Sequence, residues 1–141
     1  MIKKIYSKIN PGLILSIIHL HESSSGSLTT TKRTEITDPS YFLQAGFFEI
    51  PANTDFKAHK HNHQERKTDQ THEAILIFKG SAEISIYDTD NSFVEKVKLK
   101  EGDSTVIING GHKLKTLSET LLFEFKNGPY MGPDKDKTNF N

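Results

Sequence analysis

Short runs of alternating apolar and polar residues dominate the chain from residue 41 onward. They are rich in Ile, Val, Phe and Tyr, and turn residues such as Gly80, Gly110 and Gly111 separate them. Alternation with period two is typical of half-buried strands, and helical spacing is scarce. The pattern predicts strands at residues 41–50, 55–61, 73–79, 82–87, 93–99, 104–108, 113–117 and 120–126. Many short strands at this spacing favour an all-β, antiparallel sandwich, jelly roll or barrel.

The first 45 residues differ in pattern from the rest. Lysines precede an apolar run at residues 13–20, as in a signal peptide, but the run is short, contains Ser16 and His19, and lacks a small-residue cleavage site. No apolar stretch approaches the ~20 residues that span a bilayer. We therefore expect a cytoplasmic protein without membrane contact, with an N-terminal extension of strands or an arm at residues 1–45, a barrel at 46–127 and a C-terminal tail at 128–141.

Composition narrows the classes of function. The 141 residues are 34% hydrophobic and 26% charged, which predicts one globular domain large enough to fold without a metal. Eighteen basic residues balance eighteen acidic ones, and Arg33 and Arg66 are the only arginines, so we expect no nucleic-acid partner. The absence of cysteine excludes thiolate metal sites and a cysteine nucleophile.

Histidine is the most informative residue type. The chain has seven, and His59, His61, His63 and His72 fall within fourteen residues. On a strand, His59 and His61 would project from the same face, so two imidazoles could bind one divalent metal. A carboxylate at Glu73 and a later imidazole at His112 could add ligands. Taken alone, the cluster fits a solvated histidine-rich loop equally well.

The order of these residues resembles the first motif of the cupin family. That motif runs glycine, five residues, His-x-His, three or four residues, glutamate, six residues and glycine. Here Asn53 stands in the first glycine position, five residues before His59, and His61, Glu73 and Gly80 follow in order. Eleven residues lie between His61 and Glu73, so residues 62–71 form an insertion.

A second cupin motif is similar to residues 102–112. Gly102 and Asp103 open it, and Gly110-Gly111-His112 ends it, although Ile108 stands where the motif has proline. The resemblance implies a double-stranded β-helix, or jelly-roll barrel, that holds a metal inside. It implies Fe, Mn, Ni, Cu or Zn as the metal, bound by the set His59, His61, Glu73 and His112. We expect His63 at the cavity mouth and His72 on the opposite face of its strand from Glu73.

The resemblance also implies a class of activity. Small cupins of this kind are often isomerases or epimerases of sugars, so we expect such an enzyme acting on a hydroxy-carbonyl small molecule and pairing as a homodimer. An iron-dependent dioxygenase and a non-catalytic metal- or carbohydrate-binding module are the alternatives. Lys57, Arg66 and Tyr130 are candidate substrate-binding residues. Lys126 and Tyr130 are candidates for proton transfer through their place near the last strand, but the sequence assigns no catalytic residue.

Overall fold

A computed structural model describes residues 1–23 and 26–140. The expected N-terminal extension includes residues 24 and 25, and the expected C-terminal tail includes residue 141. These three residues lie outside the described residues. The described chain is all-β, as the alternation predicts, with 41% of residues in strands. Among these residues no helix is long and apolar enough to cross a membrane. The elements are β1 (Ile2–Tyr6), β2 (Ile14–His19), β3 (Lys32–Glu35), β4 (Gly46–Glu49), β5 (Glu73–Lys79), β6 (Ser81–Tyr87), β7 (Phe93–Lys100), β8 (Ser104–Ile107), β9 (Gly111–Thr116), β10 (Leu121–Lys126) and α1 (Pro133–Asp136).

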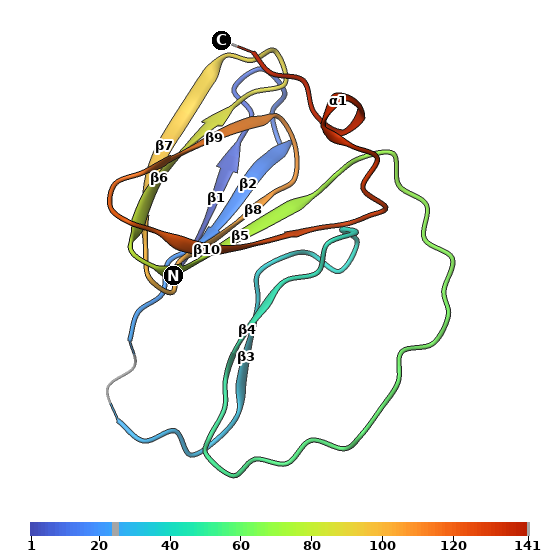
Figure 1. Cartoon of the computed structure of the whole chain (residues 1–141). Helices are drawn as coiled ribbons and strands as arrows, with labels where there is room; N and C mark the ends of the chain where they lie inside the picture. Colours follow the sequence, from blue (N-terminus) through green and yellow to red (C-terminus); the bar gives the residue numbers. More distant parts are fainter. Residues whose placement is uncertain (24–25, 141) are drawn as a thin grey trace.

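Two antiparallel sheets form the body of the molecule (Figure 1). The larger has the strand order β1-β2-β8-β5-β10, and the smaller has the order β7-β6-β9. From β5 onward the chain moves between the sheets, because β5, β8 and β10 belong to the larger sheet whereas β6, β7 and β9 belong to the smaller. The β3–β4 hairpin is a separate two-stranded sheet.

The main core uses inward-facing residues of both sheets. Ile77 of β5 and Ile84 and Ile86 of β6 are fully buried in one cluster with residues of β1, β2, β7 and β8. A second cluster contains Ile17 and Val106, and Phe47 of β4 packs against it. The first twenty residues therefore supply two strands of the larger sheet and part of its core.

Two strand predictions need correction. The strand expected at residues 41–50 is formed only at β4, and the strand expected at residues 55–61 is absent. Residues 52–71 are instead exposed and have no regular structure. At residues 55–61 the alternation of apolar and polar residues is weak, because Phe56 and Ala58 are the only apolar residues there. The apolar area that they would bury is too small to hold a strand without a neighbouring edge.

A buried carboxylate joins the N-terminal strands to the smaller sheet. Asp88, which follows β6, is fully buried and accepts hydrogen bonds from Ser7 Oγ at 2.7 Å and from the Lys8 backbone N–H at 2.6 Å. The Thr89 backbone N–H donates a third at 2.8 Å. Burial raises the pKa of the Asp88 carboxyl, but these donors outweigh it and hold the pKa below its usual value.

We therefore expect Asp88 to stabilise the fold in a pH-dependent way. Because its pKa is lower in the folded state, its contribution is full well above pH ~4 and is lost as pH falls through the folded-state value. In Asp88→Asn the urea midpoint should fall clearly at pH 7, and its difference from the unmodified protein should shrink towards pH 3. Asp134→Asn, at an exposed position of α1, is the control. An equal deficit at both pH values would contradict the assignment.

Candidate functional site

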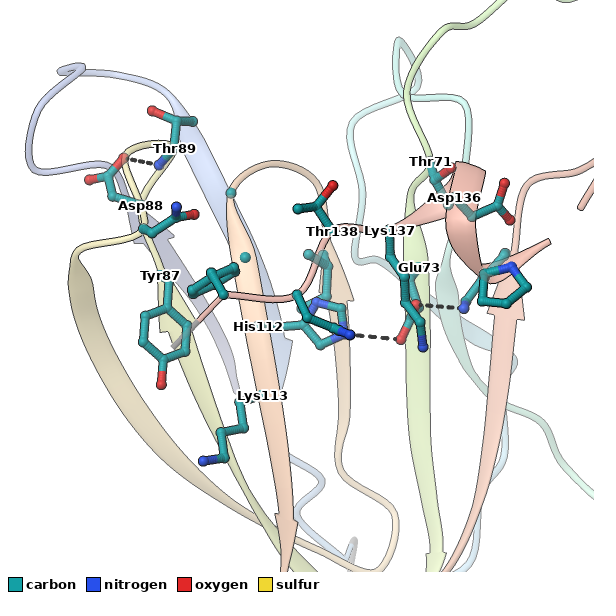
Figure 2. Close-up of a pocket in the computed structure, with 18 of the residues that line it drawn as sticks. Thr71, Glu73, Tyr87, Asp88, Thr89, His112, Lys113, Asp136, Lys137 and Thr138 are labelled. Atoms are coloured by element: carbon teal, nitrogen blue, oxygen red, sulfur yellow. Dashed lines mark hydrogen bonds and ion pairs between the residues drawn. The ribbon is translucent and has the colours of Figure 1, made fainter. Parts of the chain in front are cut away.

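A cavity of about 980 Å³ lies between the two sheets near the start of β5 and β9 and the end of β10. Both sheets and the C-terminal segment contribute to its wall (Figure 2). The residues that carry its chemistry are Glu73, Tyr87, Asp88, His112, Lys113, Glu124, Lys126, Tyr130, Asp136 and Lys137. The cavity therefore combines carboxylates, an imidazole and several ammonium groups.

A hydrogen-bonded triad of Glu73, His112 and Lys126 forms the centre of the wall. Glu73 Oε1 lies 3.3 Å from His112 Nε2, and Glu73 Oε2 lies 3.1 Å from Lys126 Nζ. Figure 2 shows His112 and Glu73 pointing towards each other from β9 and β5. The Glu73 side chain is 11% exposed, whereas those of His112 and Lys126 are 30% and 31% exposed. The carboxylate is thus the innermost group, with its two partners nearer to the cavity.

Strand register explains how these residues meet. Lys126 is directly opposite Glu73 in the antiparallel pairing of β10 with β5, so the two side chains share one face. His112 comes from the other sheet, where it is opposite Ile86 of β6. The triad therefore bridges the two sheets where the sandwich is open.

Electrostatics keep Glu73 and Lys126 charged. Burial raises the pKa of Glu73, but the hydrogen bonds and charges of His112 and Lys126 outweigh it and lower the pKa below its usual value. The pKa of Lys126 is raised, first by Glu124, whose Oε1 lies 2.9 Å from Nζ, and also by Glu73. At neutral pH the site holds an ionised carboxylate in contact with an ammonium group.

The C-terminal segment covers one side of the cavity. The Phe140 ring packs edge-on against Tyr87, with 5.2 Å between ring centroids. It also lies so close to Gly111 that a Cβ there would meet the ring at 2.5 Å. Glycine directly before His112 therefore lets the segment pack against β9. Lys137 and Thr138 follow the same path along the cavity (Figure 2).

The structure brings together two of the four residues expected as metal ligands. Glu73 and His112 are in contact, but His59 and His61 are exposed on the segment without regular structure, with their own ring centroids 5.4 Å apart. Within residues 1–23 and 26–140 no group of three or more His, Cys, Asp or Glu could hold a metal ion. Catalytic zinc sites use three protein ligands, and the Lys126 ammonium already occupies this carboxylate. As arranged, these residues do not fit a metal.

The other predicted residues divide between cavity and exterior. Tyr130 lines the cavity, whereas Lys57, His63 and Arg66 are exposed on the segment at residues 52–71. His72 is buried directly before β5 and lines a smaller cavity beside Tyr41 and Ile108, whereas Glu73 lines the 980 Å³ cavity. The ring of His72 meets Tyr41 edge-on.

Sequence reasoning missed the contribution of Glu124 and of the C-terminal segment. Strand parity contained a signal for the first, because Glu124 lies two residues before Lys126 and must share its face. The second had no local signal, since the path of residues 133–140 depends on the Phe140 contact with Tyr87.

No family model, curated protein or solved structure matches this chain. What can be inferred about its function therefore depends on the cavity and its residues.

Proposed function

We propose that the protein is an isomerase or epimerase that moves a proton at the carbon next to a carbonyl, in a sugar or similar hydroxy-carbonyl compound. The observation that carries this proposal is the Glu73–His112–Lys126 triad on the wall of the 980 Å³ cavity. Such a reaction needs a base near the carbon and a positive group near the carbonyl oxygen. A cavity of this size accommodates a small molecule.

In this mechanism His112 and Lys126 are the catalytic residues. The imidazole of His112 takes the proton from carbon. Its return to the neighbouring carbon, while the hydroxyl proton passes to the former carbonyl oxygen, gives the isomer, whereas epimerisation requires protonation of the enolate from the opposite face by water. The Lys126 ammonium donates a hydrogen bond to the carbonyl oxygen and stabilises the enolate as negative charge develops on it. Glu73 accepts hydrogen bonds from both groups and is a positioning residue, because it fixes the tautomer of the imidazole and the place of the ammonium.

The arrangement of strands supports a cupin-type jelly roll as the framework of this enzyme. From β5 to β10 the chain crosses repeatedly between two facing antiparallel sheets, with β6 and β7 as a hairpin in the smaller one, as in jelly rolls. Glu73 and His112, expected from the two cupin motifs, meet between those sheets. A jelly roll closed on all sides would also need strands beside β9 and β10.

Isotope exchange tests the proposed activity. The protein is incubated in deuterated water with a panel of keto sugars, keto-sugar nucleotides and small hydroxy-ketones, and deuterium at carbon is followed by NMR and mass spectrometry. We expect deuterium next to the carbonyl of at least one compound, without consumption of oxygen. Absence of exchange across the panel contradicts the proposal, and oxygen uptake would favour the dioxygenase.

The metal-dependent form of the proposal has its own test. If His59 and His61 joined Glu73 and His112, the four residues would provide a ligand set for one divalent ion. Protein purified without an affinity tag and reconstituted with Fe, Mn, Ni, Cu and Zn in turn should then carry close to one metal per chain by elemental analysis. Because neutral imidazole is the ligand, metal affinity should fall below pH ~6.5. A metal content below about a tenth of an equivalent would exclude this form.

A further inference from the structure

Among residues 1–23 and 26–140, the two strands that flank the cavity each leave one edge without a neighbouring strand. β10 is the outermost strand of the larger sheet and β9 is the outermost strand of the smaller one. All six residues of β10 are exposed, and Leu121, Phe123 and Phe125 each remain about half exposed. Phe123 and Phe125 project from the face of β10 opposite to Glu124 and Lys126, beside the unpaired edge, and an unpaired edge is a template for pairing with another strand. This side of the sandwich therefore has the properties of a docking site for an extended segment.

The same chain carries a long exposed segment that is held to the sheets near its end, where Gln70 Nε2 donates hydrogen bonds to the Ile108 backbone oxygen at 2.6 Å and to Asn109 Oδ1 at 2.7 Å. The segment at residues 52–71, which we call the arm, is exposed throughout and runs as a wide arc away from the two sheets (Figure 1). Loops longer than about 12–15 residues without regular structure are uncommon in compact domains. Phe48 and Ile50 just before the arm, and Phe56 within it, are 40–58% exposed. The arm thus presents apolar side chains that the chain itself leaves uncovered.

We propose that the arm of one copy of this chain adds as a strand to the open side, at β9 and β10, of a second copy, and that the exchange is reciprocal. Each copy has both an unpaired edge at β10 and a long exposed arm, so a reciprocal two-fold exchange uses both at once and leaves no free arm to extend the assembly. Most of the arm runs away from the edges of its own copy (Figure 1), and only its end returns to the sheets, where Asn127 Nδ2 donates a hydrogen bond to the Gln70 backbone oxygen at 3.0 Å. The part that carries Phe56 can therefore reach a second copy.

The exposed phenylalanines supply about half of the area that a stable dimer buries. Burying a phenylalanine removes roughly 150–250 Å² of its surface from water. Phe48, Phe56, Phe123 and Phe125 are 43–58% exposed. In two copies these side chains can bury on the order of 800 Å², a large part of the roughly 1,200–2,000 Å² typical of stable interfaces.

The exchange would also complete the cavity. His112 and Lys113 of β9 and Glu124 and Lys126 of β10 line the cavity beside the two free edges. A strand added there would close its open side, so each cavity would be walled in part by the other copy. This inference does not depend on the activity proposed above, because its tests measure assembly alone.

Cross-linking of a mixture of ¹⁵N-labelled and unlabelled protein tests whether the arm contacts its own copy or a second copy. Protein labelled with ¹⁵N is unfolded, refolded with an equal amount of unlabelled protein, and treated with a short amine-reactive cross-linker. We expect a mass of two chains by light scattering, and cross-links from Lys57 or Lys60 to Lys113 or Lys126 that join labelled to unlabelled peptides. A monomer, or arm cross-links that never mix the labels, would overturn the proposal.

Matched variants test the contact itself. Phe56→Asp in the arm and Phe123→Asp on β10 should each weaken the dimer at least 10-fold in a dilution series. Phe93→Asp, at a comparably exposed position on β7, is the control and should leave the dimer unchanged. All three positions are about half exposed, so the chains should fold, and circular dichroism checks this. A dimer weakened by Phe123→Asp but not by Phe56→Asp would mean direct pairing of β10 strands and would overturn the exchange.

Discussion

Replacing His112 by glutamine is expected to lower the rate of deuterium incorporation 100- to 10,000-fold, the usual contribution of a general base. Glutamine still reaches the carboxylate of Glu73 but cannot take a proton from carbon. The KM of the substrate should change much less than kcat, because the lost interaction belongs to the transition state. His63→Gln, at an exposed position of the arm, is the matched control and should keep the full rate.

Substitutions of Lys126 and Glu73, the two other residues of the triad, test the remaining roles in the mechanism. Lys126→Met should slow exchange about 100-fold or more through loss of the positive group, while Lys115→Met on the exposed side of β9 should have no effect. Glu73→Gln should lower kcat, and Glu73→Asp should recover part of it if the carboxylate acts by positioning. Unchanged exchange in His112→Gln would remove His112 from the mechanism.

The second large effect is expected at the turn that presents His112. Gly110 has φ 68°, and a Cβ there would lie 2.2 Å from the Tyr87 carbonyl oxygen. Alanine costs ~1–2 kcal/mol in the left-handed region, and the backbone clash adds to that cost. We expect Gly110→Ala to reduce the free energy of unfolding by about 3 kcal/mol or more, measured by urea denaturation.

Gly12→Ala separates the two causes. Gly12 also has a positive φ, 89°, but nothing lies within 4 Å of its hypothetical Cβ. Its substitution should therefore cost only the conformational part, ~1–2 kcal/mol. Equal losses in the two variants would show that the close approach of Gly110 to Tyr87 contributes nothing.

The sequence by itself determined the β class, the turns and six of the strands. Alternating isoleucines in β5 and β6 leave no other way to bury an apolar face, and Gly80, Gly102 and Gly110 adopt the positive φ values that end or begin strands at those points. It also identified Glu73 and His112 as candidates, through their residue types and the order of residues that resembles the two cupin motifs.

Tertiary structure alone decided what surrounds those two residues. Lys126 joins Glu73 through the register of β10 against β5, a pairing that no local pattern specifies. At residues 55–61 alternation was too weak to determine a strand, because a segment with two apolar side chains needs a neighbouring edge to be held extended. That edge is not formed for it within the chain, so His59 and His61 lie exposed on the arm, and Glu73 and His112 meet Lys126 instead.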